Sequence, residues 1–147
     1  GAEIPEARAG LLNLSGVDPS WAWAAGGIVT TIADLGGFSE ALFAGDLLSP
    51  DSQQALTDFQ PPSWTRADDE VMEFSLGLMR RQTDGGPAIG HEGAGNGFES
   101  MMYRFPDLGI TMVAVTNSSG QRATLEMVLQ GVIDLVRKGD NAALFGG

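Results

Sequence analysis

Residues 89–100, Ile-Gly-His-Glu-Gly-Ala-Gly-Asn-Gly-Phe-Glu-Ser, constrain the fold of this chain more than any other stretch. They contain the only histidine, His91, together with four glycines, and an alternating strand pattern begins at Phe98. Glycine has no Cβ, so the backbone of such a stretch can approach a bound group closely. The pattern predicts either a strand edge whose N–H groups and histidine face an anion or oxyanion, or a glycine-rich hairpin with a surface histidine.

Two helices are predicted before the glycine-rich stretch. Thr31 followed by Asp34 has the spacing of a capping box, and Gly45 is placed to end that helix in a left-handed conformation. The second helix is expected to begin at Ser49, with Pro50 in its first position. Apolar residues recur at helical spacing in the first helix, and we expect them to face inward. They are Ile32, Leu35, Phe38 and Leu42.

Strand patterns surround the glycine-rich stretch, and one more helix follows them. The predicted strands cover residues 74–81, 88–91, 99–105 and 110–116. The last of these is almost continuously apolar, so burial on both faces is expected. An amphipathic helix containing Leu125, Val128 and Leu129 ends near Gly139. The order of elements predicts an α+β fold, with an antiparallel sheet of three to four strands, a long C-terminal helix on one face and two N-terminal helices.

The length predicts a single domain over residues 1–147. Within it, residues 1–20 are expected to form an irregular lead-in, residues 63–70 an acidic surface loop, and residues 140–147 a frayed tail. Trp21 and Trp23 lie two positions apart and face one side of an extended segment. Core packing is their expected role, and a wall of a ligand site is the alternative.

Composition excludes several classes of partner. The formal charge of −11 makes nucleic acid and anionic membranes unfavourable partners. No apolar run approaches the roughly 20 residues that cross a bilayer, and no signal-peptide pattern stands at residue 1. The chain has no cysteine, which removes disulfides and thiolate metal sites.

The residues of this chain form no complete catalytic set. There is no Gly-x-Ser-x-Gly elbow, and the only lysine, Lys138, has Leu135 three residues before it, so Ser-x-x-Lys is absent. One histidine beside Glu92 is too few ligands for zinc. Residues 93–97 lack the Lys-Ser/Thr ending of a phosphate loop. We therefore expect no metal and no cofactor.

Four segments, in order, resemble the C-terminal half of the serine β-lactamase and penicillin-binding-protein family, in the branch of D-alanyl-D-alanine carboxypeptidases, class C β-lactamases and related esterases. Residues 21–35 look like its Ala-Gly-Gly stretch leading to an Asp-Leu helix, and residues 74–78 look like its Tyr-Gly-Leu-Gly-Leu strand. Residues 90–93 followed by Gly97-Phe98 look like its Gly-His-Thr/Ser-Gly box, and residues 107–117 look like its Asp-x-Gly strand pair ending in Thr-Asn. The resemblance covers about residues 15 to 138.

The resemblance implies roles for six positions. His91 would be the cationic or hydrogen-bonding group that faces the substrate carboxylate and the proton network of the nucleophile. Ala94 would supply one backbone N–H of the oxyanion hole, a donor whose loss typically costs about 10²–10³ in rate. The substrate-binding positions would be Glu92, Gly93, Trp21 and Arg80.

The chain also departs from the family pattern. Glu92 replaces a Thr or Ser that binds the substrate carboxylate, which favours an ester, an amine-bearing substrate or a loss of activity. The Ser-x-x-Lys and Tyr-x-Asn/Ser motifs of the family are missing, and Tyr103-Arg104-Phe105 is not the tyrosine motif. The expected function is therefore the C-terminal part of an acyl-serine hydrolase for a D-alanyl peptide, a β-lactam or an ester, inactive alone. The alternative is a non-catalytic binding or scaffold module.

Partners and location follow from the same resemblance. The N-terminal half of the enzyme would contribute strands and a helix to the sheet, so the expected partner is that half, or a second copy bound at the exposed sheet edge. The ligand would be a small acyl substrate. The family resemblance implies a periplasmic or secreted protein.

Overall fold

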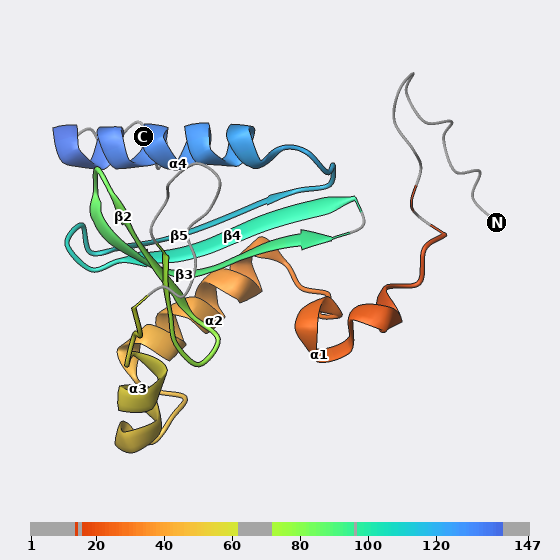
Figure 1. Ribbon diagram of the computed structural model, residues 1–147. Helices are drawn as coiled ribbons and strands as arrows, with labels where there is room; N and C mark the ends of the chain where they lie inside the picture. The colour runs from red at the N-terminus through yellow and green to blue at the C-terminus, as the bar shows by residue number, and fades with distance from the viewer. Residues whose placement is uncertain (1–13, 15, 62–71, 96, 140–147) are drawn as a thin grey trace.

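The computed structural model describes residues 14, 16–61, 72–95 and 97–139, and contains one five-stranded antiparallel sheet with helices on both faces (Figure 1). The strand order is β1-β2-β3-β4-β5, so consecutive strands are neighbours. Helix α4 covers one face, and α2 packs on β4 and β5 from the other (Figure 1). The elements are η1 (Pro19–Ala22), α1 (Trp23–Gly26), α2 (Ile32–Ala44), α3 (Pro50–Leu56), β1 (Met72–Phe74), β2 (Met79–Thr83), β3 (Gly86–Gly95), β4 (Phe98–Phe105), β5 (Ile110–Thr116) and α4 (Arg122–Lys138).

The α+β prediction is confirmed, but the sheet has five strands where three to four were expected. The predicted strand over residues 74–81 is two strands, β1 and β2, joined by a tight turn. In this turn the Ser75 N–H donates to the Leu78 carbonyl at 3.0 Å, and Gly77 adopts a positive φ of 87°. Glycine reaches this left-handed region without the steric cost of a Cβ, so the apolar run bends back on itself.

Local signals placed the helix ends correctly. The Thr31 hydroxyl accepts from the Asp34 N–H at 3.1 Å and caps α2, which ends at Gly45 with φ 85°. Ser49 caps α3 in the same way, accepting from the Ser52 N–H at 3.3 Å. Helix α4 ends at Gly139, with φ 72°. These contacts form within a few residues of chain, so sequence alone predicts them.

The main core lies between the sheet and α4. The buried residues of α4 are Leu125, Leu129 and Ile133, spaced four residues apart, so they form one stripe along the helix. Val128 was expected on this stripe but is 47% exposed, because it lies at the side of the helix. The sheet contributes alternate residues to the core, namely Ala88, Met101, Tyr103, Phe105 and Met112.

The opposite face of the sheet is covered less completely. In α2 only Ser39 and Leu42 are buried, whereas the expected core residues Ile32 and Phe38 are 56% and 49% exposed. Strand β5 was expected to be buried on both faces, but only Met112 is fully buried. This strand lies at the edge of the sheet, so the described residues provide no neighbour beyond it.

The prediction that Trp21 and Trp23 pack in the core is wrong, whereas their alternative role as a wall of a ligand site stays a prediction. Trp21 and Trp23 are 68% and 84% exposed and lie in η1 and α1, not on an extended segment. Nothing in the described part of the chain packs over them as a core. Most of the predicted lead-in, the acidic loop over 63–70 and the tail over 140–147 lie outside the described residues. Where the structure is described, no helix is both long and apolar enough to cross a membrane.

The approach of β3 to β4 generates a stability prediction. A Cβ added at Gly90 would lie 1.8 Å from the Met102 carbonyl oxygen, which the β4 backbone holds in place. We expect Gly90→Ala to lower the free energy of unfolding by about 3 kcal/mol or more, measured by urea denaturation. Gly131→Ala is the control, because this helical glycine has open space around it. It should stabilise the chain by up to about 1 kcal/mol. Equal stability of Gly90→Ala and the unchanged chain would contradict the close approach.

Candidate active-site edge

Residues 91–95 of β3 form a strand edge that extends beyond its neighbour β2. Pairing between β2 and β3 ends at Met79 opposite Gly90, whereas pairing between β3 and β4 continues to Gly95 opposite Phe98. In an antiparallel ladder every second residue directs its N–H and C=O away from the partner strand. This segment, called the free edge of β3 below, therefore presents main-chain groups on the side where the described residues provide no further strand.

The glycine-rich stretch is a hairpin with an exposed histidine, and one of its strands has an edge; that this edge faces an anion or oxyanion stays a prediction. The stretch is a strand up to Gly95, and it also forms a hairpin, because Gly95 pairs with Phe98. Gly97, with φ 79°, lies in the connection. The Gly97 N–H donates to the Ser119 hydroxyl at 3.1 Å, which ties the connection to the segment before α4.

His91 is exposed on the face of the sheet opposite to α4. Its Nδ1 lies 2.5 Å from the carbonyl oxygen of Glu92. A carbonyl oxygen can only accept, so Nδ1 carries the proton in this contact and Nε2 of the neutral ring is left as an acceptor. The backbone thus orients an imidazole that can accept a proton at Nε2.

Gly93 and Ala94 follow on the same edge, and both are exposed. A Cβ at Gly93 would lie 2.6 Å from the Ser100 hydroxyl oxygen of β4, so a glycine here allows the two strands to pair closely. Ala94 is opposite Glu99 in the ladder. The structure brings four of the six predicted site residues together as consecutive residues of one strand.

The side chain of Glu92 faces α4, on the opposite side of the strand from His91. Its carboxylate accepts from the Tyr103 hydroxyl at 2.7 Å and is hydrogen-bonded to both terminal nitrogens of Arg122, one of them at 3.1 Å. The side chain is only 9% exposed. The expected substrate contact of Glu92 stays a prediction.

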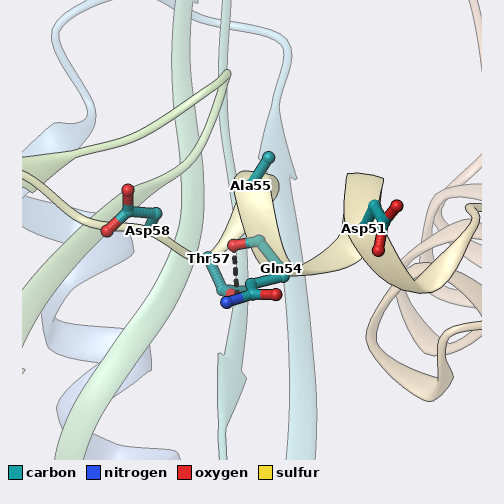
Figure 2. A pocket seen from close by; sticks show the side chains of 5 residues that line it. All are labelled: Asp51, Gln54, Ala55, Thr57 and Asp58. Atoms are coloured by element: carbon teal, nitrogen blue, oxygen red, sulfur yellow. Dashed lines mark hydrogen bonds between the residues drawn. The ribbon is translucent and has the colours of Figure 1, made fainter.

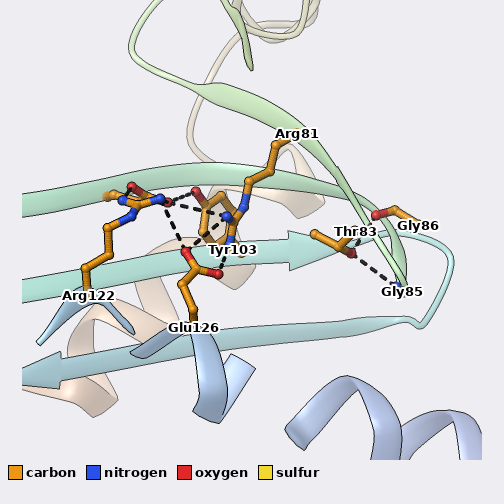
Figure 3. A network of polar contacts seen from close by, with 8 residues as sticks. Arg81, Thr83, Gly85, Gly86, Tyr103, Arg122 and Glu126 are labelled. Carbon is orange, nitrogen blue, oxygen red and sulfur yellow. Dashed lines mark hydrogen bonds and ion pairs between the residues drawn. The ribbon is translucent and has the colours of Figure 1, made fainter. Parts of the chain in front are cut away.

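Arg81 and Glu126 complete this polar cluster, which joins β2, β3, β4 and α4 (Figure 3). The Arg81 guanidinium donates to both carboxylate oxygens of Glu126, at 3.0 and 2.9 Å, and lies 4.0 Å from the Glu92 carboxylate. It also stacks 5.0 Å from the ring centre of Tyr103. Arg122 bridges the two carboxylates, since it also donates to Glu126 at 3.3 Å.

The cluster shifts the ionisation of its members. Burial alone would raise the pKa of Glu92, but hydrogen bonds from Arg122 and Tyr103 and the charges of Arg122 and Arg81 outweigh burial and hold this pKa below its usual value. Burial raises the pKa of Tyr103, and its hydrogen bond to the Glu92 carboxylate acts in the same direction. Tyr103 is therefore a protonated donor, and Glu92 a carboxylate, at neutral pH.

The two remaining predicted residues lie elsewhere. Arg80 is on the same sheet face as His91, because it pairs with Ile89, but its guanidinium is engaged by the Glu73 carboxylate at 2.6 Å. It also lies 4.5 Å from the centre of the Phe59 ring. Trp21 is in η1 and 68% exposed. Both substrate-binding assignments stay predictions.

Two hollows lie among the described residues at places that do not include His91. One lies along α3 and is lined by Asp51, Gln54, Ala55, Thr57 and Asp58 (Figure 2). The other lies at the end of α4. Neither is lined by a residue of the free edge of β3. Among the described residues, no group of three or more His, Cys, Asp or Glu side chains is arranged to hold a metal ion.

Sequence patterns did not reveal Arg81, Tyr103 and Arg122 as partners of Glu92, or Glu126 as the partner of both arginines. Part of the signal was present, because strand alternation places Glu92 opposite to His91, and Arg122 and Glu126 have the i,i+4 spacing of a helical ion pair. The alternation of side chains along a strand does not predict which helix covers the face that carries Glu92. That requires the packing of α4, more than 25 residues later in the chain.

Comparison with known proteins agrees with the resemblance seen in the sequence. A family model described as Beta-lactamase matches residues 3–130. Among solved structures, a D-stereospecific amidohydrolase from Streptomyces sp. is similar, with 28% sequence identity and a TM-score of 0.58. The similarity covers 68% of this chain and 29% of the amidohydrolase chain. The present chain therefore spans less than a third of that protein's length.

The family match extends over most of the chain, from before η1 to the middle of α4. It includes the free edge of β3 and the strands that pair with it. The sheet with a long C-terminal helix on one face agrees with the incomplete fold expected from the resemblance. The chain belongs to the β-lactamase family.

Proposed function

We propose that this chain is the C-terminal part of an acyl-serine hydrolase and that the free edge of β3 is one wall of its active site. The observation that carries the proposal is the position of His91 and Ala94 on a strand edge that continues past β2. Membership of the β-lactamase family supports hydrolase chemistry. The nucleophile and its base would come from a part of the protein outside this sequence.

In the proposed reaction, a serine oxygen attacks the carbonyl carbon of the substrate and transfers its proton to a base. The carbonyl oxygen becomes an oxyanion, which the Ala94 N–H stabilises by a hydrogen bond. The C–N or C–O bond then breaks, the leaving group takes up a proton, and water releases the acyl group from serine. His91 acts through Nε2, as a hydrogen-bonding partner in this proton network.

The proposed substrate is an amide of a D-configured residue. The similar protein from Streptomyces sp. is described as a D-stereospecific amidohydrolase, and amides and β-lactams share the acyl C–N bond that the mechanism breaks. Penicillin-like and carboxypeptidase-type substrates are narrower forms of this amide proposal, whereas an ester, with an acyl C–O bond in place of C–N, is the alternative substrate. A fluorophosphonate reports an activated serine for any of these substrates, and penicillin reports the β-lactam class.

We also propose that the second wall is supplied by the upstream half of the same protein. Edge strand β5 carries the partly exposed Val115, and exposed apolar side chains extend from η1 to α2. Such surfaces favour association, because apolar area is removed from water and an edge strand can accept another strand. The exposed apolar residues are Trp21, Trp23, Ile28, Val29, Ile32 and Phe38.

Beyond the stability prediction for Gly90→Ala, the first prediction concerns activity. The chain alone should not react with a fluorophosphonate or penicillin probe, whereas the chain co-expressed with the upstream half of its reading frame should be labelled on serine. His91→Ala should lower the labelling rate by about 10²-fold or more. Gln82→Ala is the control, since Gln82 is exposed on the same sheet face but on β2.

Three outcomes would decide between functions. A Ser-x-x-Lys motif upstream of residue 1 together with labelling of the pair supports the hydrolase. Failure of both probes to label the pair supports the non-catalytic binding module. Labelling that is insensitive to His91→Ala would remove His91 from the proposed site.

The second prediction concerns association. Without the upstream half, the chain should self-associate in sedimentation velocity at micromolar concentration, and Val115→Lys should shift it toward monomer by placing a charge beside the edge of β5. Met127→Lys is the matched control, because Met127 is 74% exposed on α4, away from that edge. A monodisperse, stable monomer of the unchanged chain would count against an uncovered edge.

A further inference from the structure

We infer that Glu92 is a positioning residue, whose buried carboxylate anchors the free edge of β3 to α4 and so holds His91 and the Ala94 amide in place. The importance of this anchor for catalysis depends on the proposed function. The anchor itself is a property of the folded chain and is tested without activity.

The free edge of β3 is restrained on one side by the ladder to β4 and at its end by Ser119, whose hydroxyl donates to the Gly95 carbonyl at 3.3 Å. Glu92 adds a restraint from the side of α4. Beyond Gly90 this segment has one partner strand in the described part of the sheet. Gly93 and Gly95 have no side chains to pack, and glycine leaves more backbone freedom to be lost on folding than other residues do. The side chains of His91 and Ala94 are exposed.

Glu92 is the member of this segment that reaches into the protein. Its side chain is 9% exposed and contacts groups from two other elements, the Tyr103 hydroxyl on β4 at 2.7 Å and the Arg122 guanidinium on α4. A bidentate guanidinium–carboxylate pair fixes orientation as well as distance. The contact therefore joins the strand that carries His91 to the first turn of α4.

Two arginines and two glutamates of the described residues meet in this cluster, namely Arg81, Arg122, Glu92 and Glu126. The Glu92 carboxylate is engaged there by Tyr103 and Arg122, on the side of the strand opposite to His91. This direction away from His91 favours a positioning role over a contact with substrate.

The third prediction is a local change in amide hydrogen exchange. In Glu92→Gln, exchange of residues 91–95 should accelerate at least tenfold relative to the unchanged chain, while exchange in β4 and β5 should stay the same. Glu126→Gln is the matched control. It removes an equal charge from the same cluster and weakens the contacts of Glu126 with Arg81 and Arg122, but both terminal nitrogens of Arg122 keep their hydrogen bonds to Glu92. It should leave residues 91–95 protected.

A second variant separates anchoring from charge. Arg122→Met removes the partner of Glu92 and should accelerate exchange of residues 91–95 as Glu92→Gln does, and the double variant should add little further. A purely Coulombic influence on the segment would have opposite signs in the two single variants. His91 gives an independent readout, since the one histidine of the sequence yields one Cε1–H imidazole NMR signal, which should broaden in both variants.

The inference is overturned if Glu92→Gln leaves exchange at residues 91–95 unchanged, or if Glu126→Gln accelerates it equally. Should Glu92→Gln not fold, Arg122→Met decides, because Arg122 is 40% exposed and its loss leaves less of the core unfilled. A failed labelling experiment with intact exchange differences would reject the hydrolase and retain the anchor. The reverse result would reject the anchor alone.

The fourth prediction uses pH. Burial acts to raise the pKa of Glu92, but the hydrogen bonds from Arg122 and Tyr103 outweigh burial and hold this pKa below its usual value in the folded chain. A carboxyl group whose pKa is lower in the folded chain than in the unfolded chain stabilises the fold at pH values above its unfolded-state pKa. This stabilisation is lost as the pH falls through the pKa of the group in the folded chain. The stability difference between the unchanged chain and Glu92→Gln, from urea unfolding, should therefore be full at pH 7 and shrink below about pH 4. A difference that stays constant down to pH 3 would contradict an ionised anchor.

Discussion

Backbone pairing between β3 and β4 is the constraint on which the candidate site depends. The ladder runs from Ile89 to Gly95, whereas β2 pairs with β3 only as far as Gly90. At Gly90 the two backbones are so close that a side chain would collide with the Met102 carbonyl. Because β4 continues beside β3 and β2 ends at Gly90, the first half of β3 lies between two strands, whereas its last residues form an open edge among the described residues.

Consecutive side chains of β3 point to opposite faces of the sheet, and the two faces have different surroundings. Ala88 and Glu92 face α4, where one packs in the apolar core and the other joins the charged cluster. His91 faces the other side and is exposed. A strand can therefore be held firmly from behind while its front remains accessible to a substrate, since consecutive side chains point to opposite faces.

The two faces of the sheet are also covered to different extents. Helix α4 buries a continuous stripe against β4 and β5, which makes this layer self-sufficient. On the other side α2 buries only Ser39 and Leu42, and Ile32 and Phe38 remain half exposed. Exposed apolar surface of this kind favours burial against another segment or chain. This asymmetry agrees with a chain that covers 29% of a similar, longer protein.

The sequence by itself determined the α+β class, the family, the caps at Thr31, Ser49 and Gly139, and the course of β4 and β5. Each of these features depends on contacts between residues a few positions apart, or on the spacing of apolar residues within one helix or strand. Residues close together in the sequence therefore suffice to predict them. The turn within residues 74–81 is also local, closed between Ser75 and Leu78 at Gly77, although the apolar run predicted one strand there. Only the tertiary structure decided that Trp21 and Trp23 are exposed and that Glu92 binds Arg122. These outcomes depend on which distant surfaces meet. Burial and charge pairing depend on how distant elements pack against one another, which the local sequence pattern does not specify.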